Sequence, residues 1–166
     1  PDGNNILLGK SIIGIEGANE REIISIGIEN PQISPDGLKI IFTSNQLYII
    51  DSDGSNKKQL TTTTALWPKF SPNGTKIVFI NEQAEKSNNQ TLYTVATIDI
   101  DGTNLKELTE PKSRVAFPQF NPEGTKIYWK YYPGNNALWR MDLNGSNIER
   151  VHPISDYKEF DFQPRN

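Results

Sequence analysis

Three segments of the chain share one pattern: Pro31-Gln-Ile-Ser-Pro-Asp-Gly-Leu-Lys-Ile-Ile-Phe42, Pro68-Lys-Phe-Ser-Pro-Asn-Gly-Thr-Lys-Ile-Val-Phe79 and Pro118-Gln-Phe-Asn-Pro-Glu-Gly-Thr-Lys-Ile-Tyr-Trp129. Self-similarity at a period of a few tens of residues is typical of repeat proteins, in which copies of one small unit stack against each other. The pattern therefore identifies the scaffold, whereas the ligand of such a scaffold depends on loops that differ between the copies.

Each copy has a second marker, an Asp-Gly or Asn-Gly pair. The three clear examples are Asp51-Ser-Asp-Gly54-Ser-Asn56, Asp99-Ile-Asp-Gly102-Thr-Asn104 and Asp142-Leu-Asn-Gly145-Ser-Asn147, and Glu16-Gly17-Ala18-Asn19 is a weaker one. These pairs predict hairpin turns of type I′, which need positive φ at both central residues. The Pro-Asx-Gly marker predicts a turn too, because proline presets φ and glycine supplies the positive φ that closes it.

Each copy therefore predicts four short strands. The first (A) is the Pro-x-Phe-Ser segment, the second (B) is Lys-Ile-x-Phe, the third (C) is the apolar run before the second glycine, and the fourth (D) ends in Gln-Leu-Thr or its counterpart. The apolar runs are too short for helices and are rich in β-branched and aromatic residues. The predicted fold class is all-β.

The two ends of the chain are in phase with each other. Residue 1 is the proline of a Pro-Asp-Gly turn, and 160–164 has the pattern of a strand A that stops at the equivalent proline. We expect one β-propeller domain over 1–166 with four four-stranded blades, the first completed by the C-terminal strand. Its repeats cover approximately 1–30 plus 157–166, 31–66, 67–116 and 117–156.

The combination Ser-Pro-Asp-Gly-x-Lys-Ile-x-Phe…Asp-x-Asp-Gly-x-Asn-x-x-x-Leu-Thr resembles the WD-like repeats of TolB-type β-propellers. Similar repeats occur in the tricorn protease and in the propeller domains of prolyl-oligopeptidase relatives. The resemblance implies a periplasmic or extracellular location and a protein partner, since TolB docks a lipoprotein over its propeller mouth. It also departs from TolB, which has six blades and a preceding α/β domain.

Four blades leave the closure of the ring open. The chain could close alone, could join a second chain as two half-rings of an eight-bladed homodimer, or could be a piece of a longer protein. The in-phase ends disfavour an arbitrary fragment, and symmetric association would cover every exposed blade face and sheet edge. We therefore favour the homodimer slightly over the other two arrangements.

Composition excludes several classes of protein. The net charge of −3 gives no basic surface for nucleic acid, and no apolar run is long enough for membrane insertion. The chain has no cysteine, which excludes disulfides and thiolate metal sites. Its only methionine is Met141 and it begins at Pro1, so we expect a processed or excised chain.

Sequence motifs for catalysis are weak. There is no Gly-x-Ser-x-Gly nucleophile elbow, and the single histidine, His152, is expected to be a solvent-facing loop residue. The aspartates near Gly54 and Gly102 do not have calcium-loop spacing, so Asx turns explain them better. The repeated asparagines at Asn56, Asn104 and Asn147 are expected to make a repeated backbone bond. We predict no catalytic residue, no metal and no cofactor.

The informative positions are those where the copies disagree. Trp67 and Phe117 precede the strand A prolines, where the other copies have Asn30 and Glu159. Because strands alternate in direction, the B–C and D–A loops share one face around the central channel, opposite both glycine turns. The polar insertion 81–91 lies on that loop face. The predicted ligand-binding residues there and in the channel are Trp67, Lys69, Arg114, Phe117, Gln119, Tyr157 and Glu159.

These observations lead to a non-enzymatic binding module with a protein or peptide ligand on the loop face. Aromatic residues and arginine are frequent anchors of interfaces, although large aromatics also cap cores. Two alternatives remain open: a substrate-gating propeller of a hydrolase whose catalytic domain is absent here, and a glycan- or metal-binding propeller.

Overall fold

A computed structural model describes residues 5–8, 11–16, 19–24, 27–87, 90–112, 114–131 and 137–153. All regular secondary structure in these ranges is β-strand, as predicted. None of the described residues belongs to a helix that could cross a membrane.

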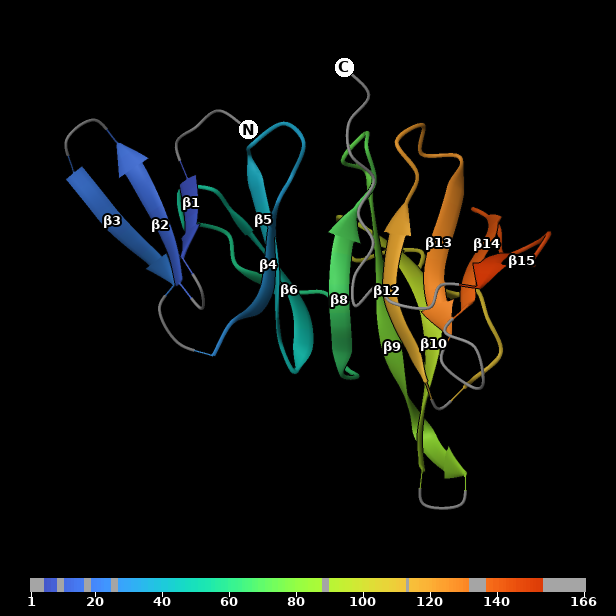
Figure 1. Cartoon of the computed structure of the whole chain (residues 1–166). Coiled ribbons are helices and arrows are strands. Elements are labelled where there is room, and N and C mark those ends of the chain that lie inside the picture. The colour runs from blue at the N-terminus through green and yellow to red at the C-terminus, as the bar shows by residue number, and fades with distance from the viewer. Residues whose placement is uncertain are drawn as a thin grey trace.

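The strands form four antiparallel sheets, three of which have four strands (Figure 1). The first sheet contains β1 (Asn5–Leu8), β2 (Ser11–Glu16) and β3 (Asn19–Ile24). The second contains β4 (Glu29–Ile33), β5 (Lys39–Ser44), β6 (Gln46–Asp51) and β7 (Lys58–Gln59). The third contains β8 (Ala65–Phe70), β9 (Lys76–Ser87), β10 (Gln90–Asp99) and β11 (Lys106–Glu107). The fourth contains β12 (Val115–Phe120), β13 (Lys126–Tyr131), β14 (Ala137–Asp142) and β15 (Glu149–Pro153).

The sheets pack face to face, as propeller blades do. In β5 the consecutive residues Ile40, Ile41 and Phe42 are all buried, although neighbouring side chains on a strand point to opposite faces. Ile41 joins a cluster that includes residues of the third sheet, whereas Ile40 and Phe42 pack on the other side. An unbroken apolar run is the pattern of a strand that is covered on both faces.

The glycine turns have the predicted positions, but the type I′ prediction is wrong. Gly54 donates its N–H to Asp51 O at 2.8 Å and has a φ of 85°, whereas Asp53 does not have positive φ. Instead Asp53 accepts the backbone N–H of Ser55 at 2.8 Å, which is the predicted Asx turn. The aspartate therefore fixes the turn, and of the four turn residues 51–54 only the glycine adopts the left-handed conformation.

Neighbouring sheets are joined by a repeated contact at these turns. Lys58 Nζ donates to Asp101 O of the next sheet at 2.5 Å, and Lys106 Nζ donates to Asn144 O at 2.8 Å. The residue six positions after each glycine packs beneath the next turn, which buries Leu60 and Leu108. In the last sheet the equivalent residue, Val151, is exposed, as expected where no further described sheet follows.

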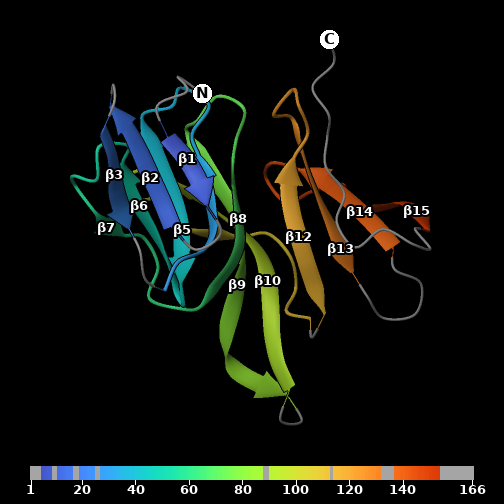
Figure 2. The same ribbon diagram turned by 60° about the vertical axis from the view of Figure 1, so that its left-hand side comes forward.

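The four sheets follow one another in chain order, with the first and last at opposite ends of the described structure (Figures 1 and 2). Within the described residues they form an open arc. The strand A expected at 160–164, which would complete the first sheet, lies outside those residues.

The insertion at 81–91 is not a loop, as we expected, but a strand pair. β9 and β10 continue beyond the other strands, and pairing extends to Ser87 opposite Gln90 (Figure 1). A bulge between Thr91 and Tyr93 separates this extension from the body of the sheet. Backbone pairing satisfies the polar groups of the insertion, so a hydrophilic segment can extend as a ribbon.

Candidate functional site

The site is built on β4, β8 and β12, the first strands of the three four-stranded sheets. These strands lie side by side, with β8 in contact with β4 and with β12. Each has a bulge at the same place: the register shifts between Glu29 and Gln32, between Leu66 and Lys69, and between Ala116 and Gln119. Two residues of each strand therefore oppose one residue of its neighbour.

The second bulge residue is always proline, which has no N–H to donate and is tolerated where the ladder is interrupted. The first has left-handed backbone geometry, with φ of 51° at Asn30, 49° at Trp67 and 52° at Phe117. Asparagine tolerates this region, but it is a rare conformation for large aromatic residues. Strained residues of this kind cluster at ligand-binding sites, so the conformation singles out Trp67 and Phe117.

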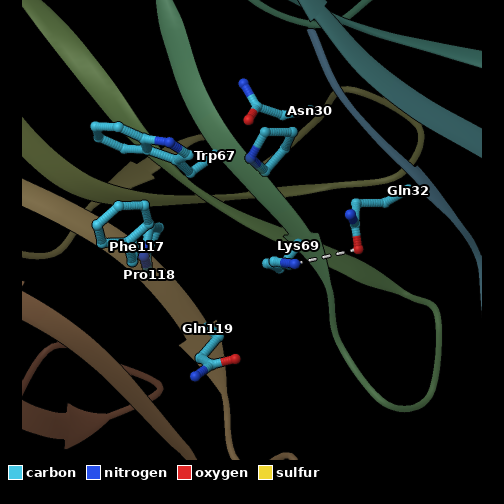
Figure 3. Close-up of a pocket in the computed structure, with 8 residues that line it drawn as sticks. Asn30, Gln32, Trp67, Lys69, Phe117, Pro118 and Gln119 are labelled. Atoms are coloured by element: carbon cyan, nitrogen blue, oxygen red, sulfur yellow. Dashed lines mark hydrogen bonds between the residues drawn. The ribbon is translucent and has the colours of Figure 1, made fainter. Parts of the chain in front are cut away.

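The bulges surround a cavity of about 90 Å³ (Figure 3). Its lining comes from three repeat positions, all three of them in β8 and β12 and two of them in β4: Asn30, Gln32, Trp67, Pro68, Lys69, Phe117, Pro118 and Gln119. This volume is well below the 300–1,000 Å³ of a typical small-molecule pocket. The cavity is therefore large enough for one chemical group of a larger ligand.

One side of the cavity is aromatic. The rings of Trp67 and Phe117 are 4.8 Å apart between centroids and tilted by 44°, within the range of favourable aromatic pairs. Both side chains are half-buried, and Trp67 also packs against the core between the third and fourth sheets. Lys130 Nζ lies 5.4 Å from the Phe117 ring centroid, and the Lys130 side chain is fully buried. The aromatic pair Trp67 and Phe117 thus belongs partly to the core and partly to the cavity wall.

The other side of the cavity is polar and contains a lysine. Lys69 Nζ donates to Gln32 Oε1 at 3.4 Å, while Gln32 Nε2 donates to Pro31 O at 2.8 Å (Figure 3). Lysine has donors only, so its partner atom on Gln32 must be the oxygen, and the second bond holds the amide in that orientation. Within the described residues Lys69 has no ion pair.

Four of the seven predicted site residues thus meet in one place: Trp67, Lys69, Phe117 and Gln119. Arg114 is exposed just before β12 and does not line the cavity. Tyr157 and Glu159 lie outside the described residues. The prediction omitted Asn30 and Gln32, although both occupy the same repeat positions as residues that it included.

The repeated aspartates and asparagines have a structural role, as expected, but their bonding differs from the prediction. Asn104 Nδ2 donates to Asp99 Oδ2 at 2.7 Å, and Lys76 Nζ binds the other carboxylate oxygen. These bonds, from Asn104 first and then Lys76, lower the pKa of Asp99 below its usual value. The predicted backbone partner is wrong, because the amide binds a carboxylate. Equivalent bonds join Asn56 to Asp51 and Asn147 to Asp142.

The remaining candidate positions are His152 and the residue types that bind metal ions. His152 lies within β15, opposite Leu138, and not in a loop. Over the described part of the chain, no three His, Cys, Asp or Glu residues gather as they would around a metal ion.

Comparison with known proteins identifies the type of repeat. No family model matches the chain. A stretch of 60 residues, 36% of the chain, is 37% identical to Tol-Pal system protein TolB of Jannaschia sp. and covers 14% of that protein. The solved structure of a putative TolB from Agrobacterium tumefaciens matches with a TM-score of 0.64 and 21% identity, over 84% of this chain and 55% of the other.

Peptidases have the same fold. Acylaminoacyl peptidase from Pyrococcus horikoshii matches with a TM-score of 0.64 and 13% identity, over 86% of this chain and 27% of the other. The matched part of the chain thus covers 14%, 55% and 27% of the length of these three proteins. The blade fold is shared by TolB proteins and peptidases, so fold alone does not decide between binding and catalysis.

Proposed function

Because the chain has the repeats and blade fold of the TolB-type β-propellers, we propose that it is a non-enzymatic module that binds a protein or peptide around the inner-strand cavity. The cavity lies where β4, β8 and β12 converge, and the surrounding loops would make the outer contacts. By the same resemblance, the module would act in the periplasm or outside the cell.

The observation that supports this proposal is the left-handed conformation of Trp67 and Phe117. Asn30 occupies the same bulge position in the second sheet, so the fold accepts a residue better suited to this conformation. Keeping two large aromatic residues there has a cost in stability, and contact with a ligand would explain it. Aromatic residues supply large contact area at interfaces and often dominate binding energy.

The size and chemistry of the cavity agree with a macromolecular ligand. About 90 Å³ takes one side chain or one chain terminus, while the rest of the ligand would lie on the loop face. The lining combines aromatic rings, prolines, amides and one amine. The apolar groups suit binding of a ligand group, and the polar groups suit its orientation. Arg114 is exposed beside this face and would make a polar contact at its rim.

Selection of peptides from a random phage-displayed library on the purified chain tests this function. We expect enriched peptides that bind the natural chain and are no longer retained by the Trp67→Asn/Phe117→Asn double variant. Enrichment of peptides that bind both proteins equally would contradict the proposal, provided that the double variant is folded by circular dichroism.

We also propose that two chains associate as half-rings. The sheets form an open arc within the described residues, and the final sheet exposes Val151 at the position where the two sheets before it bury Leu60 and Leu108 against a neighbour. An exposed apolar blade face is a surface that association would cover.

A further inference from the structure

We propose that the inner-strand cavity recognises a carboxylate group of the ligand, through Lys69. This inference rests on the proposed peptide-binding function and specifies the chemistry of its ligand. The group would be a free C-terminus or an acidic side chain, and both present the same pair of anionic oxygens.

The first argument is the charge of the lining. Lys69 is the only charged residue among the eight described residues that line the cavity, and the other polar members are amides. This described part of the wall has one amine and no carboxylate, so it presents a positive charge to a ligand.

The second argument is how Lys69 is held. Lys69 is half-buried, and its Nζ contacts Gln32 Oε1 at 3.4 Å, which is longer than a normal N–H···O hydrogen bond. The ammonium group has three donors, so the contact orients Lys69 and leaves donors for a ligand. By contrast, Lys39, Lys76 and Lys126 are all paired with aspartates at the glycine turns.

The third argument is size. A carboxylate together with the first carbon atoms of its side chain or backbone fits in about 90 Å³, whereas a folded segment of a partner does not. The carbon atoms would lie against the Trp67 and Phe117 rings, which face the cavity from the side opposite Lys69 and Gln32 (Figure 3). The aromatic rings would thus contact the carbon atoms of the ligand group, and Lys69 would contact its carboxylate.

Short peptides in acid and amide form test this inference. The probes are N-acetyl-Ala-Ala as the free acid, the same peptide as the amide, and N-acetyl-Ala-Asp-Ala-amide, which has only a side-chain carboxylate. Binding is measured from the ¹⁵N–¹H signal of the Trp67 indole during titration. We expect the acid to bind at least about tenfold more tightly than the amide, since bonds between charged partners are the stronger ones.

The Lys69→Gln variant should remove this preference and bind the acid and the amide alike. Lys57→Gln is the matched control, because it loses the same charge from an exposed lysine beside a glycine turn on the opposite face. It should keep the preference for the acid. Selective binding of the free acid but not the aspartyl peptide would identify a C-terminus as the group, and the reverse would identify a side chain.

The sequence repeat places Asp161 at the position of Lys69 in the remaining copy, outside the described residues. Each titration is therefore run on the natural chain and on Asp161→Asn. Tighter binding of the free acid or of the aspartyl peptide than of the amide, in either background, supports the inference, and the absence of both preferences from both backgrounds overturns it. If phage-selected peptides bind through Trp67 and Phe117 but are unaffected by Lys69→Gln, the carboxylate inference fails while the proposed function stands.

Discussion

Two aromatic residues of the site have a backbone conformation that aromatic residues seldom adopt. Trp67 and Phe117 have φ near +50°, with a cost of about 1–3 kcal/mol each for residues of this kind. Their half-buried rings recover part of that cost through packing. The balance between backbone strain and ring packing decides whether Trp67 and Phe117 act mainly as core residues or mainly as a binding surface.

We predict that the Trp67→Asn/Phe117→Asn double variant stays folded. Asparagine relieves the backbone strain but loses ring packing, so the free energy of unfolding should change by no more than about 2 kcal/mol per substitution. Urea denaturation measures this change. Phe79→Ala is the control, because Phe79 is fully buried and its truncation should cost about 3–5 kcal/mol. A loss as large as that of the control would assign the pair to the core.

The carboxylates at the glycine turns predict a pH dependence. The bonds from Asn104 and Lys76 lower the pKa of Asp99, so they stabilise the fold fully above the unfolded value of about 3.9. This stabilisation is lost as pH falls through the lower, folded-state pKa. Asn104→Gly keeps the left-handed backbone but removes the amide, so the pKa of Asp99 should rise and acid unfolding should begin at higher pH.

Carboxyl ¹³C chemical shifts of Asp99 during a pH titration measure this effect. Asn45→Gly is the control, since Asn45 also has positive φ but makes no side-chain bond to Asp99. An unchanged pKa of Asp99 in Asn104→Gly would mean that the amide bond does not stabilise the carboxylate.

At the scale of the elements, the contact between successive turns constrains Gly145 in addition to its backbone conformation. A Cβ on Gly145 would lie 3.1 Å from the backbone oxygen of Leu108, and Gly145 also has a φ of 87°. Gly74, in the other type of turn, has a φ of 70° but only a 3.5 Å contact with Pro35. The two positions share the conformational penalty and differ in how closely the neighbouring sheet approaches.

Gly145→Ala should therefore destabilise the chain more than Gly74→Ala. The penalty for left-handed backbone is about 1–2 kcal/mol in both, and Gly145→Ala should lose at least about 1 kcal/mol more because backbone cannot move aside as easily as a side chain. Urea unfolding of both variants gives the difference. Equal losses would show that the turns do not pack tightly enough to fix the spacing of the sheets.

Sequence repetition predicted the strands and sheets well, because turn glycines and short apolar runs are local signals. The backbone conformations of the turns were harder to predict from the sequence. Asp53 has no positive φ, because its side chain bonds to Ser55 and sets a different type of turn. The insertion at 81–91 was expected to be a loop because it is polar, yet pairing between strands satisfies its backbone.

The site could be predicted only in part. Trp67 and Phe117 stood out because they differ from the other copies, and Lys69 and Gln119 because they follow the prolines. Gln32 did not stand out, because its role is to bond Lys69. These two residues are 37 positions apart in sequence and meet only because their strands lie side by side. The bulges were not predicted either, because a register shift depends on the pairing of two strands.

At the scale of the whole molecule, the open arc of sheets predicts self-association. Static light scattering on the purified chain should give a mass near 37 kDa, twice the 18.7 kDa of one chain. Val151→Lys, at the exposed turn of the last sheet, should shift the mass towards that of one chain. A mass of 18.7 kDa for the natural chain at high concentration would rule out the half-ring dimer.

The central claim is that the ligand occupies the cavity between the inner strands. The chain has three tryptophans, of which Trp67 lines that cavity, whereas Trp129 and Trp139 line a separate groove with Val115 and Ile148. Their indole ¹⁵N–¹H signals, assigned with single Trp→Phe variants, report on the two places in one spectrum. On saturation with a phage-selected peptide, the Trp67 signal should shift while the other two stay in place. Shifts of Trp129 and Trp139 with an unmoved Trp67 would contradict the claim and place the binding site in the outer groove.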